Sequence, residues 1–241
     1  MAKLLKLSIL DSGIKTAKEN MALDAELLSD LALMPDRSLL HFYDWSAPGA
    51  TFGCFTKPER FLSLRGAEEV ALDLSVRPTG GGITFHIGDF AFSVLISAQH
   101  PAFSFNTLKN YETVNQMVVD VVRKFTGRIA QIGLLPCEPA EPNKELHAFC
   151  MAKPTKYDIM LNGRKIGGAA QRRTKFGLLH QGSICLLSPE ESVLQKVLLP
   201  DTGVYLAMLR NSGHLLPKGS TKDDLLQARL QLRNLMQEYV M

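Results

Sequence analysis

The chain has few of the features that mark several large protein classes. Its four cysteines, Cys54, Cys137, Cys150 and Cys185, include no Cys-x-x-Cys pair and no structural-zinc spacing, so we expect reduced thiols and no metal site. The formal net charge is only +3, which is too small to indicate nucleic-acid binding. No apolar run approaches the about 20 residues that span a bilayer. Because no long apolar core follows Met1 to Lys6, we expect no signal peptide, and therefore a cytoplasmic protein without membrane contact.

Repeats, low-complexity tracts and an obvious linker are also absent, so a single domain over residues 1–241 is the simplest organisation. The hydrophobic content of 46% and the charged content of 21% are typical of a soluble protein with a buried core. Strand-like segments gather in the middle of the chain, and helices interleave without a regular βαβ order. This pattern predicts an α+β fold in which helices flank a mixed or antiparallel central sheet, and we expect them on one side of it.

The individual elements are predicted from hydrophobic periodicity and from turn residues. Helices are expected over residues 16–33, 106–125, 188–198 and 221–239, with a helical turn over residues 58–64. Extended segments are expected over residues 5–9, 39–45, 50–55, 72–76, 83–86, 90–96, 157–161, 165–167 and 182–187. We expect segments 83–86 and 90–96 to pair as antiparallel strands, and Asn162-Gly163 to form the turn of a second hairpin.

Three consecutive glycines, Gly80, Gly81 and Gly82, follow Arg77 and precede His86. A glycine triplet suits a backbone that takes positive φ or lies close to another group. Cationic and titratable side chains beside this bare backbone suggest a loop that holds an anionic or carbonyl-bearing ligand on its N–H groups. No Gly-Lys-Ser/Thr follows, and the Gly-x-Gly-x-x-Gly spacing is absent, so the loop is neither a P-loop nor a dinucleotide fingerprint. A plain tight turn is the alternative.

Cys150 is a candidate nucleophile. His147, Lys153 and Lys156 are its neighbours in sequence, and Lys165 follows on the predicted hairpin. A positive environment lowers the pKa of a thiol and makes it nucleophilic. The alternative is that Cys150 is a buried small hydrophobic residue, as free cysteines usually are.

Lys165 lies on the return strand of the predicted Asn162-Gly163 hairpin. The small residues that follow, Gly167, Gly168, Ala169 and Ala170, leave room for a ligand chain or a crossing strand. The alternative is an exposed lysine on a twisted hairpin, since most lysines lie at the surface. Arg172 and Arg173 are predicted to form a solvated rim.

Four segments, in this order, resemble the catalytic domain of the biotin/lipoate protein ligase family. They are Asn20-Met21-Ala22-Leu23-Asp24, the triple-glycine loop, the Asn162-Gly163 hairpin with Lys165, and Leu178 to Ile184. The resemblance covers most of the chain and implies the fold of that domain. The family contains two chemistries. Lipoate–protein ligases activate lipoate with ATP as an acyl-adenylate, whereas octanoyltransferases pass octanoate from acyl carrier protein through a cysteine thioester and need no nucleotide.

The segment Cys150-Met151-Ala152-Lys153-Pro154-Thr155-Lys156-Tyr157-Asp158 resembles the signature of the cysteine-dependent octanoyltransferases. In the ligases Asn usually precedes that acid, and no Cys is required. A typical ligase also carries a separate C-terminal accessory domain, for which the residues after Leu198 are too few. The resemblance therefore favours the transferase, with lipoate–protein ligase A as a near second.

Three features depart from the transferase pattern, one of which is that Cys150 stands beside His147 and Phe149 rather than in the commonest context. Gly82 stands where the transferases usually have Arg, and a glycine at this position is typical of the ligases instead. Ile87 stands where both groups usually have Asp after the loop histidine. The ligase alternative would need ATP and Mg²⁺, whereas the transferase would need no cofactor. The missing Asp also supports a third alternative, a non-catalytic protein that binds lipoyl domains or a carrier.

For the transferase, the resemblance implies Cys150 as the nucleophile and Lys165 as the group that stabilises the oxyanion. The residues implied in acyl or ligand binding are Arg77 and His86 at the pocket mouth, Gly80, Gly81, Gly82, Gly167, Gly168 and Ala169, with Ile83 and Phe85 along the acyl tunnel. The implied partners are acyl carrier protein as donor and a lipoyl domain, of the glycine cleavage H protein or the 2-oxoacid dehydrogenase E2 type, as acceptor. We expect both to be acidic, which would suit the small positive charge and the arginine rim.

Overall fold

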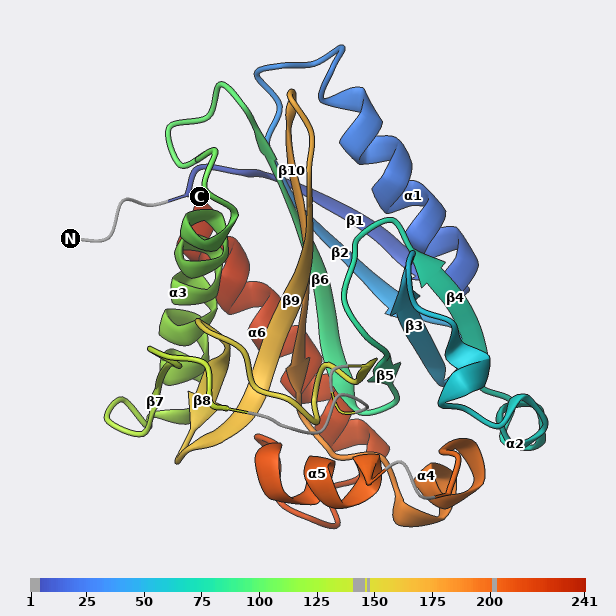
Figure 1. Cartoon of the computed structure of the whole chain (residues 1–241). Coiled ribbons are helices and arrows are strands. Elements are labelled where there is room, and N and C mark those ends of the chain that lie inside the picture. The colour runs from blue at the N-terminus through green and yellow to red at the C-terminus, as the bar shows by residue number, and fades with distance from the viewer. Residues whose placement is uncertain (1–4, 141–145, 147, 201–202) are drawn as a thin grey trace.

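A mixed sheet of seven strands forms the centre of the structure, a computed structural model that describes residues 5–140, 146, 148–200 and 203–241 (Figure 1). Its strand order is β1-β2-β6-β10-β9-β8-β7, with β1 parallel to β2 and the other neighbouring pairs antiparallel. These strands are β1 (Ser8–Lys15), β2 (Leu39–Trp45), β6 (Asp89–Ser97), β7 (Ile132–Leu134), β8 (Ile159–Leu161), β9 (Arg164–Arg173) and β10 (Gly177–Cys185). A second sheet has the order β4-β3-β5 and contains β3 (Gly49–Gly53), β4 (Asp73–Arg77) and β5 (Thr84–His86).

Capping residues explain where the three long helices begin. Thr16 caps α1 (Ala17–Asp30) and Thr221 caps α6 (Lys222–Val240), each in a capping box with the acidic residue three positions on. Asn106 caps α3 (Thr107–Thr126), and Gly127 ends that helix in the left-handed conformation. The predicted helices at these places are confirmed. The shorter helices are η1 (Pro58–Arg60), α2 (Leu64–Glu69), α4 (Glu191–Val197) and α5 (Val204–Asn211).

Helices cover both faces of the large sheet, so the expectation of helices on one side is wrong. Leu95 of β6 belongs to an apolar cluster with Leu27 and Leu28 of α1, whereas its neighbours Val94 and Ile96 belong to the cluster formed with α3 and α6. Figure 1 shows α1 on one flank of the sheet and α3 and α6 on the other. Successive strand residues point to opposite faces, and β6 is buried at every position, so both faces need cover.

Strands β5 and β6 belong to different sheets, which corrects the pairing expected for residues 83–86 and 90–96. β5 pairs with β3, whereas β6 lies between β2 and β10. The chain crosses from one sheet to the other at Gly88, whose carbonyl accepts the backbone N–H groups of Leu186 and Leu187. A Cβ at Gly88 would lie 2.4 Å from the carbonyl oxygen of Leu187, so only glycine fits this crossing.

The Asn162-Gly163 hairpin is confirmed, because both residues have positive φ and join β8 to β9 as a type I′ turn. β9 continues through the small residues to Arg173, well beyond the expected end at residue 167. β1 begins at Ser8 rather than at residue 5, and β7, α2 and α5 have no counterpart among the expected elements. Within the described ranges, no helix is long and apolar enough to cross a membrane. The single-domain organisation of residues 1–241 stays a prediction.

Candidate active site

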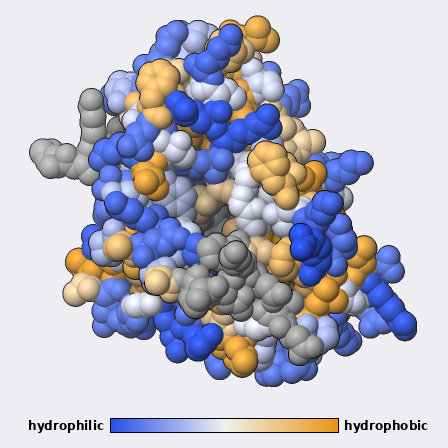
Figure 2. Space-filling view, in the orientation of Figure 1, coloured by the Kyte–Doolittle hydropathy of each residue, from blue (hydrophilic) through white to orange (hydrophobic). Residues whose placement is uncertain are grey.

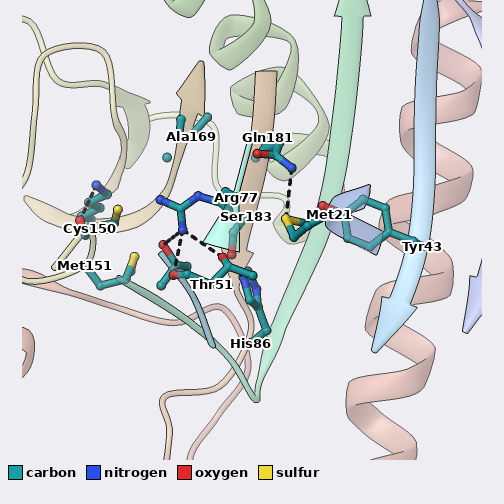
Figure 3. A pocket seen from close by; sticks show the side chains of 15 residues that line it. Met21, Tyr43, Thr51, Arg77, His86, Cys150, Met151, Ala169, Gln181 and Ser183 are labelled. Atoms are coloured by element: carbon teal, nitrogen blue, oxygen red, sulfur yellow. Dashed lines mark hydrogen bonds between the residues drawn. The ribbon is translucent and has the colours of Figure 1, made fainter. Parts of the chain in front are cut away.

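A pocket lies between strands β3 and β5 of the small sheet and strands β9 and β10 of the large one; we call it the Cys150 pocket. Figure 2 shows this face of the molecule hollowed near its centre. Cys150 lies at one end of the pocket, and Met21 and Tyr43 lie at the far end (Figure 3). Six of the expected site residues line it, namely Arg77, His86, Cys150, Lys165, Gly168 and Ala169.

The triple-glycine loop lies beside the Cys150 thiol, although Gly80, Gly81 and Gly82 do not themselves line the pocket. Gly81 has positive φ, and a Cβ there would lie 3.8 Å from Cys150 Sγ. A Cβ at Gly82 would lie 2.4 Å from the carbonyl carbon of Ala148. Ile83 N–H donates to the Ala148 carbonyl (2.6 Å), and Cys150 N–H donates to the Ile83 carbonyl (3.0 Å). The loop is therefore more than a plain turn, since its glycines admit the strand-like segment that carries Cys150.

Arg77 holds this loop together from inside, with only 5% of its surface exposed. Its guanidinium donates to the carbonyls of Gly82 (2.7 Å) and Gly80 (3.1 Å), and to the carbonyl (2.8 Å) and hydroxyl (2.9 Å) of Thr51. Arg77 is therefore buried rather than placed at the pocket mouth. No carboxylate pairs with it in the part of the chain that the structure describes. In Figure 3 the sulfur of Cys150 points toward this guanidinium.

The surroundings of Cys150 favour the thiolate. Burial by itself raises the pKa of the Cys150 thiol, but the charges of Arg77 and Lys165 act in the opposite direction. Hydrogen bonds from the Thr84 hydroxyl and the Gly82 N–H assist them, and the resulting pKa lies below the usual thiol value. Such a thiol is a better nucleophile at neutral pH than an unperturbed cysteine.

Among the described residues, most of the cations expected around Cys150 do not supply its positive environment. Lys153 pairs with Glu138 (2.5 Å), and the Lys156 ammonium lies over the ring of Tyr157, 4.9 Å from its centre. His147 lies outside the described residues. Of the expected cations, Lys165 helps to lower the pKa of the Cys150 thiol. Arg77, which is distant in sequence and was not expected to act on Cys150, lowers this pKa more than Lys165 does.

Lys165 is buried, with 4% of its side chain exposed, so it is not the surface lysine of the alternative prediction. Its Nζ lies 2.7 Å from Asp158 Oδ2 and donates to the carbonyl oxygen of Cys150 at 2.6 Å. A Cβ at Gly168 would lie 2.5 Å from Asp158 Oδ1 and 2.9 Å from Lys165 Cε. Glycine at position 168 thus makes room for the ion pair. Gly167, by contrast, is enclosed between Ile159 and Ser183 and does not line the pocket.

Asp158 is a further candidate site residue, one that the sequence motifs alone did not indicate. Its other oxygen accepts a hydrogen bond from the Tyr111 hydroxyl (2.6 Å), which in turn accepts one from Ala169 N–H (2.9 Å). Thr155 donates to Oδ2 from its backbone N–H (2.6 Å) and its hydroxyl (3.0 Å). Asp158 therefore ties Lys165 to helix α3 and to the segment after Cys150. The Tyr-acid pair in the Cys150 segment was the available signal.

His86 is also buried in a network rather than placed at the pocket mouth. Its Nδ1 lies 2.7 Å from Asp89 Oδ2, and its Nε2 lies 2.8 Å from the Thr51 hydroxyl. Ser183 donates to the same Asp89 oxygen (2.7 Å). A carboxylate thus does reach His86, although Ile87 occupies the position where the resemblance led us to look for it.

The inner wall of the pocket is fixed by Asp24, the acid of the Asn20-to-Asp24 segment. Asp24 is fully buried and accepts hydrogen bonds from Ser93 (2.6 Å), Gln181 (2.6 Å) and the ring of His41 (2.8 Å). Gln181 also accepts a hydrogen bond from Thr79, next to the glycine loop (2.7 Å). The helix α1 motif is therefore connected to the loop through two side chains.

The family model described as the lipoyl protein ligase A/B catalytic domain matches residues 16–204. The chain belongs to this family. A lipoyl protein ligase A/B relative named octanoyltransferase LipM, from Geobacillus kaustophilus, is 31% identical over 84% of this chain and 73% of its own length.

Two solved structures share the fold of this lipoyl protein ligase A/B chain. A putative lipoate protein ligase from T. acidophilum with bound lipoic acid is 19% identical, with a TM-score of 0.65 over 97% of this chain and 94% of its own. A bi-partite lipoate protein ligase from Thermoplasma acidophilum, described with its E2 lipoyl domain, is 19% identical, with a TM-score of 0.62 over 97% of this chain and 91% of its own. The expected α+β, ligase-like fold is confirmed.

Proposed function

We propose that this chain is an octanoyltransferase that passes an octanoyl group from the thioester of acyl carrier protein to a lysine of a lipoyl domain, through a thioester on Cys150. The observation that carries the proposal is the Cys150 thiol, whose pKa is lowered by Arg77 and Lys165 and which lies at one end of a pocket. The octanoyltransferase named among its relatives supports the same chemistry. Neither half of this reaction needs a cofactor.

In the first half-reaction, the Cys150 thiolate attacks the carbonyl carbon of the donor thioester. The Sγ–carbon bond forms, the bond to the donor sulfur breaks, and the donor leaves as a thiolate that takes up the proton lost by Cys150. Lys165 donates to Asp158 and to the Cys150 carbonyl, so one of its three N–H groups is left for the oxyanion.

In the second half-reaction, the neutral amine of the acceptor lysine attacks the acyl-enzyme. The nitrogen–carbon bond forms, the Sγ–carbon bond breaks, and one amine proton passes to the Cys150 thiolate. The products are the octanoylated lysine and the free thiol. The same oxyanion donor serves both steps, because the carbonyl carbon stays beside Cys150 throughout.

The acyl chain would extend from Cys150 along Gly168 and Ala169 toward Met21 and Tyr43. Met21 and Tyr43 are buried, so they would close the far end of the acyl site. Ile83 and Phe85, which we expected along this tunnel, line a different pocket on the far side of β5. The acyl chain is therefore assigned to the space between β9 and β10 and the small sheet.

Protein substrates would approach the rim beside the glycine loop. Arg172 and Arg173 are exposed there, and Arg172 donates to the carbonyl of Pro78 (3.2 Å). Acidic partners would complement this rim. We propose a lipoyl domain of the H-protein or E2 type as acceptor and acyl carrier protein as donor, in the cytoplasm.

The deciding experiment is the intact mass of the chain after mixing with octanoyl–acyl carrier protein. The wild-type chain and Cys137→Ala, which changes an exposed cysteine, should each gain one octanoyl group, and Cys150→Ala should gain none. Octanoylation of a lipoyl domain at the wild-type rate by Cys150→Ala would overturn the proposal.

The ATP-dependent lipoate ligase remains the second candidate, because this fold is also that of a ligase with bound lipoic acid. It would show lipoylation that requires ATP and Mg²⁺ and that survives Cys150→Ala. The non-catalytic alternative was supported only by the missing Asp after His86. Because Asp89 places a carboxylate beside His86, this support is weaker. Saturable lipoyl-domain binding without acyl transfer under either condition would select it.

A further inference from the structure

A second pocket lies behind the Cys150 pocket, enclosed by β5, the end of β10 and helix α5; we call it the side pocket. Its walls include Phe85, Leu187, Met208 and Ser212. It shares three lining residues with the Cys150 pocket, namely Thr84, Met151 and Ser183. Because Met151 directly follows Cys150 in the chain and lines both pockets, the two pockets meet beside the candidate nucleophile.

The side pocket also adjoins a wide surface groove formed by α4, α5 and residues 214–220. Five residues line both spaces, namely Leu187, Ser188, Pro189, Met208 and Ser212. The Cys150 pocket, the side pocket and the groove therefore form a row that runs from the thiol to the surface.

Asp89, one of the residues that line the side pocket, has a carboxylate oxygen without a hydrogen-bond partner among the described residues. Asp89 is 4% exposed, and its Oδ2 accepts hydrogen bonds from His86 and Ser183. Its Oδ1 has no hydrogen-bond partner among the described residues. A buried carboxylate oxygen without a donor is costly, so the site suits a ligand that brings an N–H or O–H group. The remaining walls are largely apolar, apart from the hydroxyls of Thr84, Ser183, Ser188 and Ser212.

We propose that the side pocket receives the pantetheine arm of the acyl donor, an inference that rests on the proposed octanoyl transfer. The arm is a narrow chain of methylene and dimethyl groups interrupted by two amides and a hydroxyl. Its amide or hydroxyl would donate to Asp89 Oδ1, and its apolar parts would lie against Phe85 and Met208. The arm's sulfur would then reach Cys150 from the side of Thr84, while the octanoyl chain occupies the Cys150 pocket.

The order of the pockets favours the arm over the acyl chain as occupant. The terminal methyl group of an acyl chain needs apolar walls around it, and the buried side chains of Met21 and Tyr43 line the far end of the Cys150 pocket. An arm attached to a carrier protein needs instead a passage that continues to the surface, and the side pocket continues into the groove.

The test compares two octanoyl thioesters that differ only in how much of the arm they contain, octanoyl-pantetheine and octanoyl-N-acetylcysteamine. The rate at which each acylates Cys150 is measured by intact mass in a single turnover. Wild-type chain should prefer octanoyl-pantetheine by at least about tenfold, equivalent to about 1.4 kcal/mol. Ser188→Trp, at the junction with the groove, should remove most of this preference while acylation by the shorter thioester stays within about twofold of wild type.

A second variant and a matched control make the result specific. Ser212→Phe narrows the side pocket from the α5 wall and should have the same effect as Ser188→Trp. Ser192→Trp places the same bulk on an exposed serine of α4 that lines neither pocket, and should retain the preference. Agreement between the two side-pocket variants excludes a local distortion at either residue.

Three other outcomes would each count against the inference. Equal slowing of both thioesters by Ser188→Trp would mean that the side pocket does not recognise the arm. A changed preference between octanoyl and decanoyl chains would place the acyl chain in the side pocket instead. If neither thioester nor octanoyl–acyl carrier protein acylates the wild-type chain, both the proposed transferase function and the inference about the side pocket are rejected. This outcome differs from the other two, in which the wild-type chain is still acylated.

Discussion

We propose that the buried ion pair of Lys165 and Asp158 has both a structural and a catalytic role, which a double-mutant cycle can separate. Both side chains are at most 4% exposed, and their charged atoms lie 2.7 Å apart. Asp158→Asn leaves the ammonium without its carboxylate, which should cost about 3–5 kcal/mol of stability. Lys165→Met should cost less, because Asp158 keeps its hydrogen bonds from Tyr111 and Thr155. In the double variant no charge is left unpaired, so its loss should be about 1–3 kcal/mol smaller than the sum of the single losses.

Urea unfolding measures the structural part. With a slope of about 3 kcal/mol per M, a loss of about 3 kcal/mol lowers the midpoint by about 1 M. Single-turnover acylation of Cys150 measures the catalytic part. Lys165→Met and the double variant should both lose about 100- to 1,000-fold in rate, because both lack the oxyanion donor. The double variant should therefore recover stability without recovering activity.

Two results would refute this reasoning. Strictly additive losses of stability would show that the two side chains do not act as a pair. A folded Lys165→Met variant that acylates at the wild-type rate would remove Lys165 from the oxyanion site. Lys109→Met is the control, because it breaks an exposed pair with Glu112 (2.9 Å) and should change stability by less than about 1 kcal/mol.

Three further predictions concern the packing, charge and pH dependence of the site. Gly168→Ala places a Cβ 2.5 Å from a carboxylate oxygen of the ion pair, so it should lower the free energy of unfolding in urea by about 1–3 kcal/mol and slow the acylation of Cys150. Gly133→Ala is the control, because its Cβ would lie in open space, and it should change neither quantity. In a variant with Cys150 as its only cysteine, half-maximal iodoacetamide labelling should occur at a lower pH than for a thiol of pKa about 8.5. Arg77→Gln in that variant should raise the pH of half-maximal labelling, because it removes a charge that stabilises the thiolate. An unchanged labelling pH in Arg77→Gln would contradict the role of the Arg77 charge. Burial lowers the pKa of His180 to about 3, so below pH about 6.5 the unfolded chain binds a proton that the native chain does not, and stability should fall by up to about 1.4 kcal/mol per pH unit toward pH 3. His180→Gln should lack that share of the acid dependence, as read from urea midpoints at several pH values.

Elements whose ends are set by a few adjacent residues were predictable from the sequence. The Asn106 cap and the Gly127 stop lie at the ends of one amphipathic helix, and the helix follows from these local signals. Asn162-Gly163 fixes a type I′ turn in the same way, because both residues tolerate positive φ. Cys150 and Lys165 could be singled out from the sequence because the resemblance places them on such local motifs, and their catalytic roles stay predictions.

Contacts that depend on the path of the chain between sheets were not predictable. A position-by-position comparison finds Ile87 after His86 and no acid, yet the crossing at Gly88 brings Asp89 within 2.7 Å of the imidazole. Ile83 and Phe85, which were expected along the acyl tunnel, line the side pocket and not the Cys150 pocket, because β5 belongs to the small sheet and lies between the two pockets. The large electrostatic contribution of Arg77 to Cys150 also required the fold, because more than 70 residues separate them in sequence.

The charges around Cys150 favour both half-reactions of the proposed transfer. Arg77 is buried and has no carboxylate partner among the described residues. The Cys150 thiolate can therefore supply the negative charge that Arg77 lacks. The first half-reaction consumes this thiolate, and the acyl-enzyme leaves the cation with only carbonyl and hydroxyl partners. A thiol of lowered pKa is also the better leaving group, because Arg77 and Lys165 stabilise the negative charge that develops on Sγ as the Sγ–carbon bond breaks. When the acceptor lysine attacks, the departing sulfur carries its negative charge beside Arg77 and Lys165 until the amine proton reaches it. An uncharged surrounding would weaken both steps, which is why a neutral substitution at Arg77 should slow deacylation as well as acylation.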